Sequence, residues 1–133
     1  MANEKIIKEI ASGKKKGFKD VDFSGVDLRC ADLSGVNLSG VNLRDADLRD
    51  ADLSSADLKR TNLADANLSG ANLRDANLRD ANLSGAVFDG ANLRDADVTD
   101  ACMTGVDLSS ADVSGVDLSS AFDFVRMYES DDL

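Results

Sequence analysis

Residues 71–85 read ANLRDANLRDANLSG, which is one five-residue block written three times with changes only in its last two places. The same block, A(D/N)Lxx, continues in both directions without insertion or deletion, so that residues 21–120 divide into twenty consecutive blocks. A fixed short period over such a length is typical of a repeat architecture, in which each repeat is one structural unit. The fold is therefore specified by what the five places of the block hold.

The third place of the block, called the centre below, is apolar in all twenty blocks and is Leu in fifteen of them. The first place is small throughout, with thirteen Ala, six Val and one Thr. The second place is Asp or Asn in eighteen blocks, and only Val87 and Cys102 depart from this rule. We expect the centres to form the structural core, and they are Phe23, Leu28, Leu33, Leu38, Leu43, Leu48, Leu53, Leu58, Leu63, Leu68, Leu73, Leu78, Leu83, Phe88, Leu93, Val98, Met103, Leu108, Val113 and Leu118.

A period of five does not suit an α-helix, because successive centres would turn by about 140° around the helix axis and cover its whole surface. In an extended segment, alternate side chains share a face, so the first place and the centre point inward and the second place points outward. The last two places hold turn formers, and eight of the ten glycines stand in the fifth place, where a positive φ is tolerated. The pattern predicts an all-β solenoid whose coils stack with parallel hydrogen bonds. Inward valines recur at separations of both fifteen and twenty residues, so the pattern leaves open whether a coil has three or four sides.

Blocks such as ADLRD at 46–50, ANLRD at 71–75 and 76–80, and ANLSG at 66–70 and 81–85 resemble the pentapeptide-repeat family. The resemblance covers the twenty blocks in one register. It implies a right-handed quadrilateral parallel β-helix with four blocks per coil, and therefore about five coils here.

Composition limits the function classes. The chain has no His, no Pro and no Trp, and 15 Lys+Arg against 25 Asp+Glu give a net charge of −10. Without His, the Ser-His-Asp and Cys-His nucleophile systems and most catalytic zinc sites are excluded. Acidity disfavours direct binding to nucleic acid or to an anionic membrane. We therefore expect no enzyme, no catalytic residue, no cofactor, no metal site and a neutral or basic protein partner.

The two ends of the chain break the repeat. Residues 1–20 predict a capping helix and a basic connector, because Asn3 suits an N-cap and Ile6, Ile7 and Ile10 share one helix face. No apolar run at this end is long enough for a signal peptide or a membrane span, which favours a cytoplasmic location. Residues 121–133 predict a C-terminal cap and a disordered tail. The apolar residues there would either fold back over the last coil or join two chains, giving a monomer or a C-terminal dimer, and they include Phe122, Phe124, Met127 and Tyr128.

A rigid protein-interaction scaffold of unknown partner is the function that these features favour. The alternative, suggested by the family resemblance, is a DNA mimic that inhibits or protects a type II topoisomerase such as gyrase. On a four-sided coil the blocks would carry net charges of −2, −3, −3 and −2 on successive faces. That even acidity suits the alternative, whereas the arginines among the carboxylates oppose it.

Three minor groups of residues have simpler interpretations. Asn42, Asn62 and Asn82 are expected to stack as an amide ladder from coil to coil. Carboxylate pairs such as Asp50 with Asp52, or Asp95 with Asp97, are expected to be solvated surface. The two cysteines, Cys30 and Cys102, are expected to lie too far apart for a disulfide.

Overall fold

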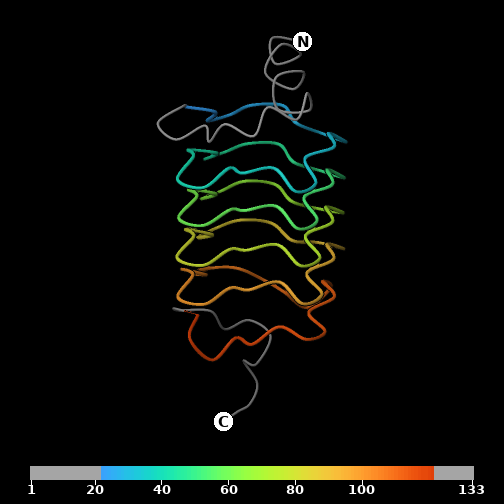
Figure 1. Cartoon of the computed structure of the whole chain (residues 1–133), viewed down its shortest axis with the longest axis vertical. Coiled ribbons are helices and arrows are strands. Elements are labelled where there is room, and N and C mark those ends of the chain that lie inside the picture. Colours follow the sequence, from blue (N-terminus) through green and yellow to red (C-terminus); the bar gives the residue numbers. More distant parts are fainter. Residues whose placement is uncertain (1–21, 122–133) are drawn as a thin grey trace.

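The computed structural model describes residues 22–121, which form a stack of coils along one axis (Figure 1). The capping helix expected around Asn3 and the cap or dimer contact expected at Phe122, Phe124, Met127 and Tyr128 lie outside the described residues. Parallel bridges join residues that are twenty apart in the sequence, from Asp22↔Asn42 to Asn92↔Asp112. One coil therefore takes four blocks, and the three-sided alternative that the valines left open is wrong.

The coil has four faces, each contributed by every fourth block. The first face carries the centres Phe23, Leu43, Leu63, Leu83 and Met103, and the second face carries Leu28, Leu48, Leu68, Phe88 and Leu108. The chain then passes through the third and fourth faces before it returns to the first. A place in one block consequently lies directly over the same place twenty residues later.

Each face is held by one bridge residue rather than by an extended strand, and residues 22–121 contain no helix. Three backbone hydrogen bonds join most blocks to the next coil, and the fifth-place N–H makes one of them, as in Cys30 N–H to the carbonyl of Arg49 at 2.9 Å. The N–H of Leu28 donates to the carbonyl of Asp47 at 2.8 Å, and the N–H of Asp47 donates to the carbonyl of Val26 at 2.8 Å. The second place of each block therefore carries the bridge, because its carbonyl serves the coil before it and its N–H also reaches that coil.

Every corner is a β-turn closed from the first place of the next block back to the centre, as in Ala31 N–H to Leu28 O at 3.1 Å. The fifth-place residue has a positive φ in all corners from Gly25 to Gly105 and again at Gly115, as type II turns require at their third residue. Ten of these residues are not glycine, and each left-handed non-glycine residue costs free energy that the surrounding ladder must offset. Among the fifth-place residues within 22–121, only Ser110 and Ser120 lack a positive φ. There the serine Oγ accepts a hydrogen bond from Gly90 N–H at 3.2 Å and from Asp100 N–H at 3.3 Å.

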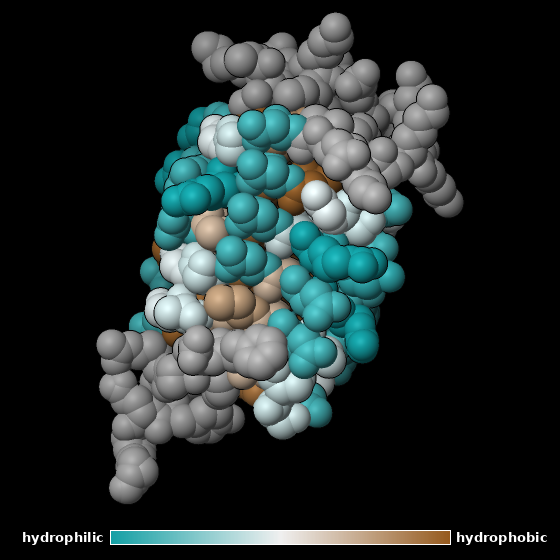
Figure 2. Space-filling model, turned by 90° about the vertical axis from the view of Figure 1, so that its left-hand side faces the viewer, coloured by the Kyte–Doolittle hydropathy of each residue, from teal (hydrophilic) through white to brown (hydrophobic). Residues whose placement is uncertain are grey.

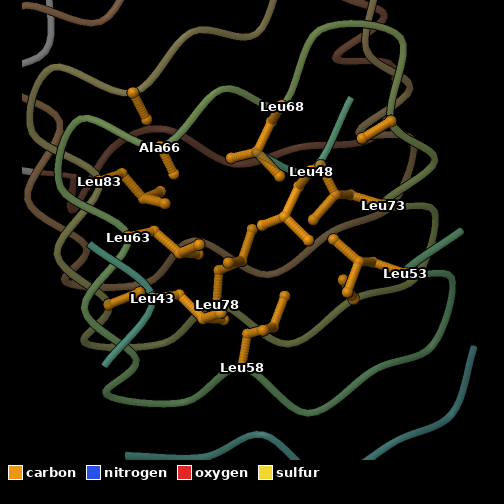
Figure 3. Close-up of a cluster of buried hydrophobic side chains, with 14 of the residues drawn as sticks. Leu43, Leu48, Leu53, Leu58, Leu63, Ala66, Leu68, Leu73, Leu78 and Leu83 are labelled. Atoms are coloured by element: carbon orange, nitrogen blue, oxygen red, sulfur yellow. The ribbon is translucent and has the colours of Figure 1, made fainter. Parts of the chain in front are cut away.

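The interior of the coil is a continuous column of centres and small first-place residues. Figure 3 shows the labelled leucines of the middle coils pointing from the surrounding ribbon toward one another. Eighteen of the twenty centres are buried, while Val113 and Leu118 in the last coil are only half-buried. Fully burying a Leu side chain contributes about 1.5–3 kcal/mol, so the stacked centres are the main stabilising term. The buried first-place Thr61 satisfies its hydroxyl by donating to Leu38 O at 2.9 Å.

Candidate interaction surface

The outer surface of the coil is built from second-place side chains that close the corners. All eighteen Asp and Asn residues in the second place accept a hydrogen bond from the backbone N–H two residues later. Examples are Arg74 N–H to Asn72 Oδ1 at 3.1 Å and Ser114 N–H to Asp112 Oδ1 at 3.0 Å. These Asx turns explain why the block requires Asp or Asn there.

Asn42, Asn62 and Asn82 stack from coil to coil as expected, because parallel bridges join Asn42 to Asn62 and Asn62 to Asn82, but few of their side chains bond between coils. Asn42 Nδ2 does donate to Asp22 Oδ1 in the neighbouring coil at 3.2 Å. For Asn62 and Asn82, the side-chain hydrogen bonds found in residues 22–121 are local ones, in which Oδ1 accepts from Ala64 N–H and Ser84 N–H at 3.0 Å each. The two kinds of bond use different atoms, since Asn42 accepts from Arg44 N–H through Oδ1 and donates to Asp22 through Nδ2. Asp or Asn placed before a turn former was the sequence signal for the local turn.

The Asx turns also set the electrostatics of the surface. The Arg29 guanidinium donates to Asp27 at 2.9 Å, and this bond, with a weaker effect of the Arg29 backbone N–H, lowers the pKa of Asp27 from 3.8 to about 2. Ser24 N–H lowers the pKa of Asp22, and the Ser114 side chain lowers the pKa of Asp112. These carboxylates therefore stay ionised into the acid range.

Arginine side chains neutralise part of the acidity, but only along part of the axis. Arg29 and Arg49 alternate with Asp27 and Asp47 in one cluster. Arg79 pairs with Asp97 at 3.3 Å and Arg94 with Asp112 at 3.7 Å. Residues 95–121, in contrast, contain six Asp and no Lys or Arg. The charge is thus even among the faces and uneven along the axis, with the excess of carboxylates at the C-terminal coils.

Within residues 22–121, the cysteine and carboxylate side chains form neither a metal-binding cluster nor a disulfide. No cluster of three or more potential metal ligands occurs among residues 22–121. Cys30 is exposed, Cys102 is half-buried, and both thiols are free. The same stretch contains no helix that is long and apolar enough to cross a membrane. Figure 2 shows one side of the molecule, on which the surface is predominantly hydrophilic.

Comparison with known proteins identifies the family to which this repeat sequence belongs. A family model for pentapeptide repeats, with eight copies, matches residues 18–54, 42–80 and 71–109. The chain belongs to the pentapeptide-repeat family. No curated protein sequence gives a significant match.

Solved pentapeptide-repeat structures resemble the chain. HetL from the cyanobacterium Nostoc sp. strain PCC 7120, involved in heterocyst differentiation regulation, is 33% identical with a TM-score of 0.52, over 82% of this chain and 48% of HetL. The chain thus spans about half the length of HetL. The protein alr5209 from Nostoc PCC 7120 is 32% identical with a TM-score of 0.46, over 86% of this chain and 95% of alr5209. QnrB1, a plasmid-mediated fluoroquinolone resistance protein, is 26% identical with a TM-score of 0.48, over 79% of this chain and 66% of QnrB1.

Proposed function

We propose that the protein is a non-enzymatic scaffold whose outer faces bind a neutral or basic protein partner. The observation that carries this proposal is that the inward and second-place side chains already have structural roles. The centres and first-place residues fill the axis, and all eighteen second-place Asp and Asn residues are engaged in Asx turns. Ligand pockets are concave and partly apolar, whereas this interior is already occupied. The outer faces are therefore the surfaces left for recognition.

Affinity purification from the source organism, with the intact chain as bait, tests this proposal. An unrelated acidic protein of similar net charge serves as the control bait, because it reports binding that depends on charge alone. A protein captured only by the repeat chain should then bind it directly in calorimetry with both components purified. Equal capture by the two baits, or no direct binding, would contradict the proposal.

DNA mimicry of a type II topoisomerase is the second candidate, and the net charge of −10 favours it. The ion-paired arginines on the surface, such as Arg49 with Asp47 at 2.7 Å, reduce the match to the unbroken charge of a phosphate backbone. A gyrase supercoiling assay with added protein separates the two candidates. Unchanged supercoiling and unchanged quinolone sensitivity would remove the second one.

We also propose how the regular coils end. Residues 1–20 would form the N-terminal capping helix with its basic connector, and residues 121–133 the C-terminal cap with its tail, around a right-handed quadrilateral β-helix. The half-buried Val113 and Leu118 support a cap at the C-terminal end, because an open coil leaves apolar centres exposed. The same residues would serve a C-terminal dimer. Sedimentation of the wild type and of Phe124→Asp distinguishes the two, since only a dimer would change its mass. A cytoplasmic location completes the proposal.

A further inference from the structure

Two of the twenty blocks break the rule of Asp or Asn in the second place, and the coil brings them to one corner. Val87 lies on the second face and Cys102 on the first face, in the following coil. The corner between these two faces is formed by Ser84 and Gly85 in one coil and by Thr104 and Gly105 in the next. The two departures, fifteen residues apart in sequence, therefore flank the same corner.

Contacts across this corner connect the two residues step by step. Cys102 Sγ lies 3.5 Å from Thr104 Oγ1, and Thr104 O accepts from Gly85 N–H at 2.9 Å. Gly85 is two residues before Val87. Cys102 also bridges to Asn82 in the coil above. Together with Ala64 and Ser84, which stand above Thr104 in the corner, these side chains define what we call the neutral corner: Ala64, Asn82, Ser84, Val87, Cys102 and Thr104.

Folding does not explain the composition of this corner. Val87 provides no Asx acceptor for the N–H of Asp89, a bond that costs about 1 kcal/mol when lost. It is 38% exposed, and it is the one large hydrophobic side chain that is exposed among residues 22–121. Asp or Asn at either position would close the turn and face water, as in the other eighteen blocks. A single exposed Val is unremarkable alone, but here it coincides with the second departure and with a local lack of charge.

Charge distinguishes the neutral corner from the rest of its own column and from the other corners. The fourth-place columns elsewhere hold two cations each, such as Arg74 over Arg94 and Lys59 over Arg79, whereas this column holds one, Arg44, and continues toward the C-terminal end with the uncharged Ala64, Ser84 and Thr104. Carboxylates border it, namely Asp65 above it, which also lies 3.8 Å from the exposed Arg44 guanidinium, Asp89 at the far end of the second face and Asp107 below Val87. In Figure 2 the hydrophilic column in the middle of the visible side is likewise interrupted by less polar side chains toward the C-terminal end.

We propose that the neutral corner is the docking surface for a protein segment that presents an apolar side chain flanked by lysine or arginine. The apolar side chain packs on Val87 and the Cys102 thiol, and the flanking cations face Asp65, Asp89 and Asp107. This inference rests on the proposed interaction function and assigns the face and the partner chemistry to it. Complementary charges around an apolar centre give such a contact its specificity and its salt dependence.

The test uses a displayed library of random twelve-residue peptides, selected on the intact chain, with affinities then measured by fluorescence anisotropy. Val87→Asn with Cys102→Asn restores the block rule at both positions, so that fold and stability should be kept. The matched control, Asp52→Asn with Asn77→Asp, changes two second-place residues on the other faces without changing the net charge.

We expect selected peptides to carry an apolar residue between basic ones, to lose at least tenfold in affinity on the Val87→Asn/Cys102→Asn variant, and to bind the control within twofold. Neutralising Asp65, Asp89 and Asp107 to Asn should weaken binding severalfold and flatten its salt dependence. Peptides that bind both variants equally would overturn the neutral corner and leave an interaction protein that uses another face. Binders without the apolar-basic pattern would overturn the neutral corner alone. Failure to select any binder on the intact chain would overturn the neutral corner and would also count against the interaction function.

Discussion

Oδ1 of Asp50 occupies the space in which a Cβ on Gly70 would lie, one coil further along the chain, and Asp50 Cγ would be 3.4 Å from that Cβ. The same relationship joins Asp65 to Gly85 and Asp95 to Gly115. Both members of each pair have a positive φ, so both belong to left-handed corners of one column. The fifth place is therefore coupled between coils, and glycine serves there for space as well as for conformation.

Replacing Gly70 by Ala should destabilise the chain by about 1–2 kcal/mol, because Ala is strained at φ +69. The clash with the Asp50 carboxylate adds up to about 1 kcal/mol for a displaced rotamer. Gly90→Ala is the control, since its φ of +67 is similar and nothing lies within 4 Å of the added Cβ. Urea unfolding followed by far-UV circular dichroism measures both. Equal losses would show that the carboxylate moves away at no cost, and adding Asp50→Ser to Gly70→Ala should remove any excess.

Asn72→Ala should lower the free energy of unfolding by about 1 kcal/mol, because Arg74 N–H loses its acceptor. Asn72→Asp keeps an acceptor oxygen in the same place and should stay close to the wild type. Thermal unfolding of the two variants side by side distinguishes the Asx turn from other roles of the amide. If both variants lose the same amount, the turn bond is not the stabilising feature of the second place.

Leu73→Asp should abolish cooperative folding, since Leu73 is completely buried and a charge would enter the apolar axis of the middle coil. Leu73→Ala should cost about 2–5 kcal/mol and remain measurable by urea unfolding. Arg74→Ala is the neighbouring control. The Arg74 side chain is exposed, and the ion pair between its Nε and Asp75 Oδ2, at 3.8 Å, lies at the surface, where such a pair contributes little to stability. We expect the control to change stability by less than about 0.5 kcal/mol. A folded Leu73→Asp variant would contradict the stacked-centre core.

The Asx carboxylates make stability dependent on pH at the acid side. Folding lowers the pKa of Asp22, Asp32, Asp97 and Asp112 below 3.8, so their contribution is complete above about pH 4 and is lost as the pH falls through the folded values. Replacing these four residues by Asn keeps the turn acceptors and removes the titration. The variant should therefore unfold less steeply than the wild type between pH 4 and pH 2, as measured by circular dichroism. Identical acid transitions would contradict this assignment.

Asp27 provides a site-specific check of the same electrostatics. Carboxyl carbon shifts in NMR should give a pKa of about 2 for Asp27 in the wild type. Arg29→Ala removes the largest cause and should raise that pKa, while the backbone N–H of residue 29 should still hold it below 3.8. No change in the Arg29→Ala variant would show that the guanidinium contact does not form in solution.

Periodicity alone predicted a solenoid, the inward centres and the turn character of the last two places, because side-chain direction in an extended segment depends only on local geometry. The structure shows eighteen centres buried and a positive φ in nearly all corners, including ten residues that are not glycine. The stacking of Asn42, Asn62 and Asn82 was confirmed by the bridges. The sequence analysis missed the local role of their Oδ1 atoms, which accept from the backbone N–H two residues later.

The sequence by itself determined which side chains face the axis and which close a corner, since both follow from position within five consecutive residues. Only the tertiary structure decided the number of blocks per coil, because that number depends on backbone hydrogen bonds between residues twenty apart. The same spacing placed Asp50 over Gly70 and brought Val87 and Cys102 to one corner. Contacts of this kind join residues that are distant in the chain, so no local pattern specifies them.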